Sequence, residues 1–209
     1  EGGAGAADSA QTWYSTTARS SVPFVVVGYF DSTQVTAGTW AANPTNVVVN
    51  PKVRPGQTVV RAAATTSAVV TLSSGSVIPY DNTKPQNTEG TQILAAPAYT
   101  PTSASNILKI SGEYSFNGAS GQVNVGTALF QDSTADALYS NRSHVGSTSQ
   151  PTSVAVSHEM LAATASATTF KMRGGPATAV NVYVNGNSSG TQVDNGTSLA
   201  KLTVEEISV

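Results

Sequence analysis

The side chains that could carry chemistry are few in this chain, and their spacing is poor for catalysis. It has no cysteine and only two histidines, His144 and His158. Neither histidine is part of a G-x-S-x-G turn, and the two are not spaced like zinc ligands. His158 follows the alternation of a predicted strand and should face a core or a subunit interface, whereas His144 lies in a predicted loop. We therefore expect no nucleophilic triad, no metal site and no cofactor.

Carboxylates are the other candidates, because the cleavage of a glycan needs a pair of them. Asp132 and Asp136 lie in a predicted turn, where an aspartate side chain commonly bonds to the backbone. Glu205 and Glu206 are adjacent in a predicted strand, so their side chains should point to opposite faces. Neither pair predicts a shared site, and we expect no enzymatic activity. A depolymerase built from carboxylates on distant loops stays open as a third alternative.

The composition excludes two classes of partner. The formal net charge is −2, and the 10 Lys and Arg residues are spread over the whole chain. A nucleic-acid-binding protein needs a basic face to neutralise phosphates, so we expect no nucleic acid partner. The longest apolar run, residues 24–30, is far shorter than the roughly 20 residues that span a bilayer, so we expect no membrane insertion.

The elements that position these residues are predicted to be strands. Leu108, Ile110, Tyr114 and Phe116 alternate with polar residues, which indicates a strand with one buried face. Similar runs follow at 123–129, 154–160, 170–173, 180–184 and 202–205. Asn185-Gly186 is a typical two-residue hairpin turn. About seven or eight such strands with turns between them predict an all-β chain, an antiparallel β-sandwich.

The chain is predicted to have three parts. Residues 1–15 should be a flexible linker, residues 16–75 a small β-rich N-terminal subdomain, and residues 76–209 the sandwich. Whether residues 1–75 fold by themselves or add strands to the sandwich stays open. Because the chain begins at Glu1 rather than at a methionine, we expect it to be a piece of a longer or processed protein. The strand-like runs of the N-terminal part are 24–30, 46–50, 58–63 and 68–72.

The order of the segments from Ile78 onward carries a resemblance to a known family. The segments are Asp81–Gly90, Thr100–Leu108, Ala128–Asp132, Thr168–Gly175, Asn185-Gly186 and Ser198–Ile207. In this order they resemble a domain near the C-terminus of tailed-bacteriophage tail fibre, tail spike and head fibre proteins. The chain departs from that pattern at 193–198, where VDNGTS replaces a second glycine pair.

The resemblance implies a jelly-roll-like sandwich that forms a homotrimer on the virion surface, in an extracellular setting. It implies a host cell-surface polysaccharide or protein receptor as partner, and contacts to other virion proteins through the N-terminal end. We therefore predict host-receptor binding at the tip of a fibre or spike. The alternative hypothesis is a structural protein, a capsid decoration or head-fibre protein without a receptor role. Receptor-binding residues are sought on two predicted loops, and they are Tyr139, Asn141, Arg142 and His144 on one, and Tyr183, Asn185 and Asn187 on the other.

Overall fold

The computed structural model of the chain consists of two compact units, Glu1–Lys52 and Val53–Val209. It describes residues 56–148 and 150–209, and within residues 1–55 only the backbone of short strands. These strands are β1 (Gly2–Ala4), β2 (Trp13–Ser15), β3 (Tyr29–Asp31), β4 (Gln34–Thr36), β5 (Thr39–Trp40) and β6 (Thr45–Val48).

The strands of the first unit form antiparallel pairs, β1 with β2, β3 with β6 and β4 with β5. A flexible linker was predicted over residues 1–15, whereas β1 and β2 within this range form an antiparallel pair. The other residues of this range lie outside the described part of the chain. Of the strand predicted at 24–30, only Tyr29 and Phe30 are described, and they belong to β3. The strand predicted at 46–50 is confirmed as far as Val48 in β6.

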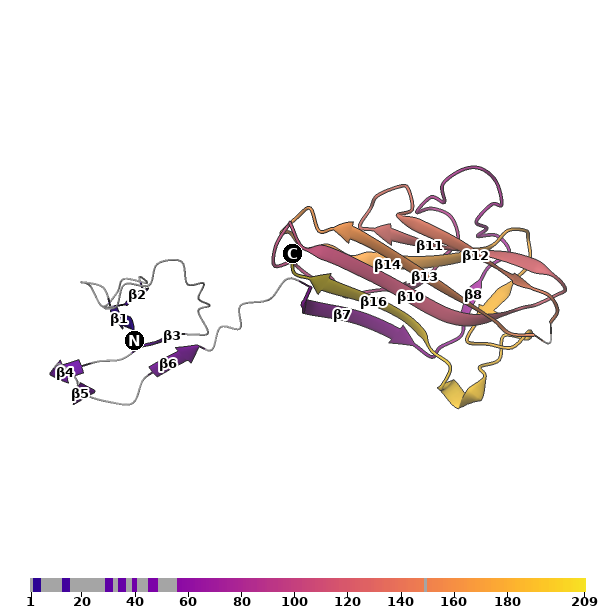
Figure 1. Cartoon of the computed structure of the whole chain (residues 1–209). Helices are drawn as coiled ribbons and strands as arrows, with labels where there is room; N and C mark the ends of the chain where they lie inside the picture. Colours follow the sequence, from indigo (N-terminus) through magenta and orange to yellow (C-terminus); the bar gives the residue numbers. More distant parts are fainter. Residues whose placement is uncertain are drawn as a thin grey trace. The chain divides into compact units, whose positions relative to one another are not determined.

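The second unit consists of two antiparallel sheets, drawn in Figure 1. The six-stranded sheet has the order β7-β16-β10-β15-β8, with β13 on the other edge of β10, and the four-stranded sheet has the order β12-β11-β14-β9. No α-helix occurs among the described residues. The all-β, antiparallel two-sheet fold is thus confirmed. The strands are β7 (Thr58–Thr66), β8 (Val70–Leu72), β9 (Thr91–Ala95), β10 (Ile107–Gly118), β11 (Val123–Gln131), β12 (Tyr139–Val145), β13 (Thr152–Leu161), β14 (Phe170–Pro176), β15 (Val182–Val184) and β16 (Ala200–Ile207).

Strand β10 is the centre of the six-stranded sheet. One of its edges pairs with β13 from Ile107 to Phe116, and the other pairs first with β16 and then with β15. Its alternation is as predicted, because Leu108, Ile110, Tyr114 and Phe116 are all at most 2% exposed and belong to the main core. Tyr114 remains satisfied in the core through a 2.5 Å hydrogen bond between its hydroxyl and that of Thr127.

The boundary predicted near residue 76 is not where the two units divide. Strands β7 and β8 lie before it, yet β7 pairs with the last strand, β16, and β8 pairs with β15. The pairing continues beyond β7, since the backbone N–H of Gly56 donates to the Ser208 carbonyl at 2.7 Å. The C-terminus therefore lies beside the start of β7 (Figure 1). Residues 1–75 were predicted either to fold by themselves or to add strands to the sheets of the second unit. Residues 58–66 and 70–72 do the latter, because β7 and β8 belong to the six-stranded sheet.

The connector before β9 packs on the outer face of the four-stranded sheet. Ile78, which is 1% exposed, forms a second small core with Ala128 and Phe130. The approach is so close that a Cβ on Gly126 would lie 2.9 Å from the Ile78 side chain, and one on Gly175 would lie 2.8 Å from the Ser76 carbonyl oxygen. These glycines are therefore needed to let the connector lie flat on the sheet.

Arginine side chains hold the two ends of the same connector. Arg173 donates from Nε to the carbonyl of Glu89 and from Nη2 to that of Gly90, both at 2.7 Å. Arg142 donates to the carbonyls of Ile78 and Pro79. The described part of the chain contains no helix with the length and apolar character needed to cross a membrane.

Candidate ligand-binding site

The first predicted binding loop is a strand. Residues Tyr139–Val145 form β12, the edge strand that pairs with β11, so the prediction of a loop there is wrong. The strand is polar on both faces because its side chains are used in contacts with neighbouring segments. Asn141 donates through Nδ2 to the Ala155 carbonyl at 2.9 Å, and His144 Nδ1 lies 3.2 Å from Asn124 Oδ1.

Arg142 and Tyr139 differ in how far they are available to a ligand. The Arg142 guanidinium lies 4.8 Å from the centre of the Tyr80 ring while it holds the connector, so it already has partners. Tyr139 and His144 are exposed on the surface of the sandwich. The four predicted residues of this strand therefore share an edge strand, and none of them lines the hollows on the six-stranded sheet described below.

The second predicted loop has its turn three residues later than predicted. Gly186 pairs with Gln192, the Asn187 N–H donates to the Thr191 carbonyl at 2.8 Å, and the Gly190 N–H donates to the Asn187 carbonyl at 3.0 Å. The turn is thus formed by residues 187–190, and the prediction of a turn at Asn185-Gly186 is wrong in position.

The burial of Asn185 explains this shift. Its side chain is 1% exposed, and its Nδ2 donates to the carbonyls of Thr66 at 2.9 Å and Ala68 at 3.2 Å. Tyr183 lies on β15, and Gly190 packs against its ring so closely that a Cβ there would be 3.0 Å away.

A hollow of about 350 Å³ lies at this end of the six-stranded sheet. Its lining comes from the end of β10 and from residue 151 on one side, and from the segment 185–198 on the other. We call it the amide hollow. Of the predicted residues, it brings together Asn185 and Asn187 but none of the other five. The lining residues are Ser115, Phe116, Asn117, Pro151, Asn185, Gly186, Asn187, Val193, Asp194 and Ser198.

Two lining residues carry buried amide oxygens that lack hydrogen-bond partners. They are Oδ1 of Asn117 and Oδ1 of Asn185, two of the four such side-chain atoms in the described part of the chain. The orientation of the Asn185 amide is set by its Nδ2, which donates to two carbonyls. A buried acceptor without a partner destabilises a fold by about 1–3 kcal/mol, so each such group calls for an explanation.

Left-handed backbone conformations occur around the same hollow. Asn185 has φ 55°, Asp194 φ 52° and Asn195 φ 50°. Left-handed backbone is rare outside glycine, although Asn and Asp tolerate it best. Unpartnered amide oxygens and left-handed Asn and Asp residues thus coincide at the amide hollow.

Sequence reasoning missed Ser115, Asn117, Asp194 and Ser198. A signal was present for Asn117, which continues the polar face of the alternating run in β10 but is 6% exposed rather than solvated. The signal for Asp194 was the triplet at 194–196, which forms the 3₁₀ turn η1 (Asp194–Gly196) at the rim of the hollow.

Glu206 is a structural carboxylate. As predicted, it points to the face opposite Glu205, and it is 1% exposed. Thr102 donates to it from N at 2.8 Å and from Oγ1 at 2.7 Å, and Asn106 donates from Nδ2 at 2.7 Å. Burial raises the pKa of Glu206, but the hydrogen bonds from Asn106, Thr102 and the Ser103 N–H outweigh burial and hold the pKa below its usual value. The carboxylate therefore fixes the segment 102–106 to the last strand.

The aspartates are also held by separate partners. Asp132 accepts from the Thr169 N–H at 2.7 Å and from the Thr168 hydroxyl at 2.9 Å. It thus bonds to a backbone group 37 residues away rather than within its own turn, where the bond was predicted. Asp136 bonds instead to side chains of the connector, accepting from Gln86 at 3.0 Å and from Lys84 at 3.4 Å. The bonds from Gln86 and Lys84 lower its pKa.

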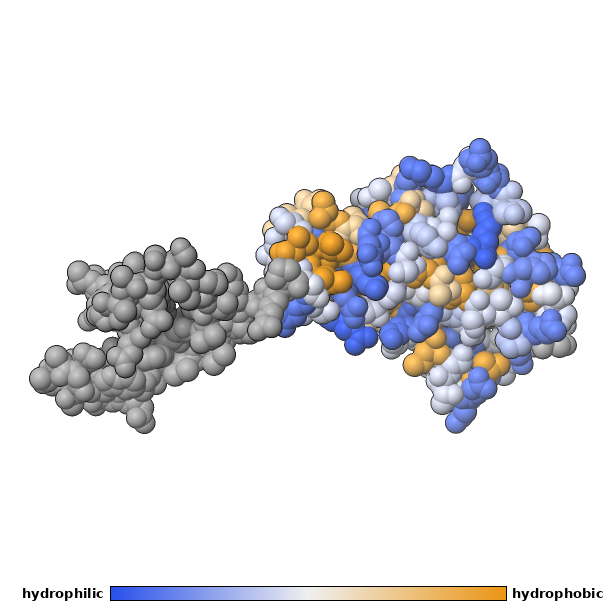
Figure 2. Space-filling model, viewed as in Figure 1, coloured by the Kyte–Doolittle hydropathy of each residue, from blue (hydrophilic) through white to orange (hydrophobic). Residues whose placement is uncertain are grey.

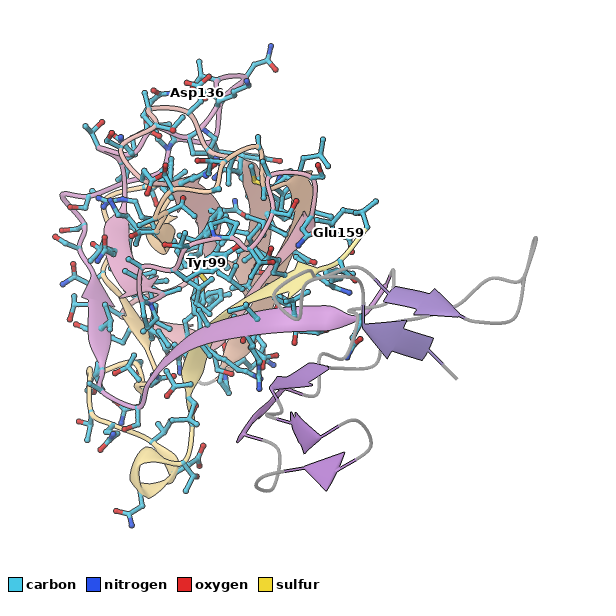
Figure 3. The ribbon with its side chains drawn as sticks, turned by 90° about the vertical axis from the view of Figure 1, so that its left-hand side faces the viewer. Tyr99, Asp136 and Glu159 are labelled. Atoms are coloured by element: carbon cyan, nitrogen blue, oxygen red, sulfur yellow. The ribbon has the colours of Figure 1, made fainter. Side chains whose placement is uncertain are left out.

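The labelled residues of Figure 3 show how far apart the ionisable groups lie. Asp136 is in a loop at the top, away from Glu159 on the six-stranded sheet, and Tyr99 lies among the side chains of the sandwich. Burial, together with the negative charge of Glu206, raises the pKa of Tyr99 to about 12. His158 is half-buried on β13, on the same face as Val156. Within the part of the chain that the structure describes, no three His, Cys, Asp or Glu side chains group as metal ligands.

Comparison of the chain with known protein families and with curated proteins found no match.

Proposed function

We propose that this chain is a virion-surface module of a bacteriophage fibre or spike, and that it binds a host cell-surface glycan in the amide hollow. The virion setting comes from the resemblance of residues 78–209 to the C-terminal domains of such fibres, including a jelly-roll-like arrangement of the strands. The binding site comes from the geometry. The function is recognition rather than catalysis.

The observation that carries the proposal is the pair of unpartnered amide oxygens, Oδ1 of Asn117 and Oδ1 of Asn185, at one hollow. A sugar presents many hydroxyl donors, and amide oxygens are suitable acceptors for them. Both oxygens are buried, so a ligand reaches them only when the segment 185–198 moves. Each bond formed would then remove a destabilising group, which favours the bound state.

The rim of the hollow fits the same ligand class. Asn187 and Asp194 are exposed at the rim, and Ser115 and Ser198 are partly exposed. These are hydrogen-bonding groups, and no lysine, arginine or histidine is among the lining residues. A ligand that is rich in hydroxyls and carries no strong negative charge suits this lining.

Cell-surface staining tests the proposal. Fluorescently labelled protein is applied to a panel of bacterial strains that differ in capsule and lipopolysaccharide, and we expect strong staining of some strains. Ser115→Leu should abolish this staining because the larger side chain fills the floor of the hollow. Ser111→Leu is the matched control, since Ser111 lies on the same face of β10 outside the lining.

Two results would contradict the proposal. If folded protein stains no strain in the panel, the receptor role is wrong and the structural alternative, a capsid decoration or head-fibre protein, takes its place. If Ser115→Leu stains as strongly as Ser111→Leu, a receptor is bound, but not in the amide hollow.

A further inference from the structure

A second hollow adjoins the amide hollow on the outer face of the six-stranded sheet. It has a volume of about 280 Å³ and is lined by Glu113, Tyr114, Ser115, Ser153, Val154, Ala155 and Leu199. Ser115 lines both hollows, and Ser198 of the first is followed by Leu199 of the second. The two hollows are therefore neighbours along β10, with Ser115 common to both linings.

Strand β10 supplies the floor of both hollows. Glu113, Ser115 and Asn117 are alternate residues on the outer face of this strand, and four residues of strand extend about 13 Å. Strand β13 forms one side, where Ser153 pairs with Ser115 and the two hydroxyls are 2.8 Å apart. The segment 185–199 forms the other side. A floor of this length is longer than one sugar ring.

The charged residues that line the two hollows are both acidic. Glu113 lines the second hollow and Asp194 the first, and neither lining contains a cationic residue. Lys201 is the cross-strand neighbour of Glu113 in the register of β10 with β16. Asp194 has no such neighbour among the residues of the lining. A glycan chain with carboxylates would be repelled here, whereas a neutral chain would not.

The geometry points to one continuous groove that takes an extended, neutral glycan chain rather than a single sugar. The amide hollow holds one part of the chain, Ser115 and Ser153 lie beneath the middle, and the second hollow holds the next part against Leu199. Leu199 is 49% exposed, so it offers an apolar surface to the less polar face of a ring. This inference rests on the proposed function and adds the length and the charge of the ligand.

Oligosaccharide ladders test the inference. The probes are maltose-, cellulose- and chitin-derived oligomers of increasing length, together with oligogalacturonates as acidic chains. Binding to the full chain is measured by calorimetry. For the sugar that binds, we expect the affinity of its oligomers to be at least about tenfold higher than that of the single sugar. Only the longer chains reach the second hollow. Oligogalacturonates should bind weakly or not at all.

Ala155→Trp separates the two hollows, because Ala155 lies in the second hollow only. The large side chain should remove the gain that longer oligomers show and leave the binding of the single sugar unchanged. Ser157→Trp is the control, since Ser157 is the next exposed residue on the same face of β13 and lines neither hollow. Circular dichroism of both variants verifies that the sheets form.

Each outcome decides one part of the inference. Equal affinity for short and long neutral oligomers, unchanged in Ala155→Trp, would overturn the continuous groove while leaving the amide hollow as a binding site. Binding of oligogalacturonates as tight as that of neutral chains would overturn the charge selectivity. Absence of binding to every neutral probe by protein that stains cells would overturn the inference of a neutral chain, whereas absence of staining would contradict the proposed function itself.

Discussion

Among single residues, Glu206 connects sequence to stability most directly. Its buried carboxylate accepts hydrogen bonds from Thr102, Ser103 and Asn106 instead of from water, and all three residues are about a hundred positions away in the chain. We predict that Glu206→Gln lowers the free energy of unfolding by about 2 kcal/mol, because an amide places its own donors against these donors. Urea unfolding measures the effect. Glu205→Gln is the control, and equal unfolding midpoints for both variants would argue against this role.

The same residue predicts how stability depends on pH. The pKa of Glu206 is lowered in the folded chain by its hydrogen bonds, so its contribution to stability is fully present above the unfolded pKa of about 4.3. That contribution is lost as the pH falls through the lower folded pKa. The difference in unfolding free energy between the wild type and Glu206→Gln should therefore shrink below pH 4. A difference that stays constant from pH 7 to pH 3 would contradict the assignment.

The sequence predicts the orientation of the Glu206 side chain but not its hydrogen-bond partners. Its adjacency to Glu205 in an alternating run predicted opposite faces, which the structure confirms. Its partners could not be predicted, because Thr102 and Asn106 belong to a segment that the fold alone brings to the end of β16. Asn117 shows the same limit, since the sequence marks it as a polar-face residue but not as one that is buried.

At the level of the elements, the connector over the four-stranded sheet depends on glycine. We predict that Gly175→Ala destabilises the sandwich by about 1–3 kcal/mol, because the new Cβ would lie 2.8 Å from the backbone of Ser76 and Ile78. Thermal unfolding followed by circular dichroism checks this. Gly75→Ala provides the comparison, since its nearest neighbour would be 3.7 Å away. Similar melting temperatures for the two variants would show that the connector is not held as closely as described.

Strands with one apolar face were predictable, and polar strands were not. The alternation of Leu108, Ile110 and Tyr114 located β10 because burial of one face imposes that period. β12 was missed because Asn141 and His144 use their side chains for hydrogen bonds on the surface, which leaves no apolar period to detect. The turn at Asn185-Gly186 was misplaced because a typical turn residue is buried there by its bonds to Thr66 and Ala68.

For the molecule as a whole, the resemblance and an exposed apolar area both favour self-association. Figure 2 shows apolar residues gathered at the end of the sandwich where the C-terminus lies. Leu161 is 60% exposed and Val209 70% exposed, and Leu161 pairs across the sheet with Ile107. A second and third copy of the chain would cover such side chains in a closed assembly.

We predict that light scattering gives three times the chain mass of 21.3 kDa. Leu161→Glu should shift the mass towards that of a single chain, because it places a charge in the apolar area. Tyr80→Glu, at an exposed residue of the connector, should leave the mass unchanged. A wild-type chain with the mass of a stable monomer would contradict the trimer.

We propose that the amide hollow, and not the edge strand β12, holds the ligand. Hydrogen exchange measured with and without the surface polysaccharide of a strain that the protein stains tests it most directly. We predict slower exchange in residues 115–118 and 185–198 when the polysaccharide is bound, because the segment 185–198 closes on the ligand. Slower exchange confined to residues 139–145, or no change in residues 185–198, would contradict the claim.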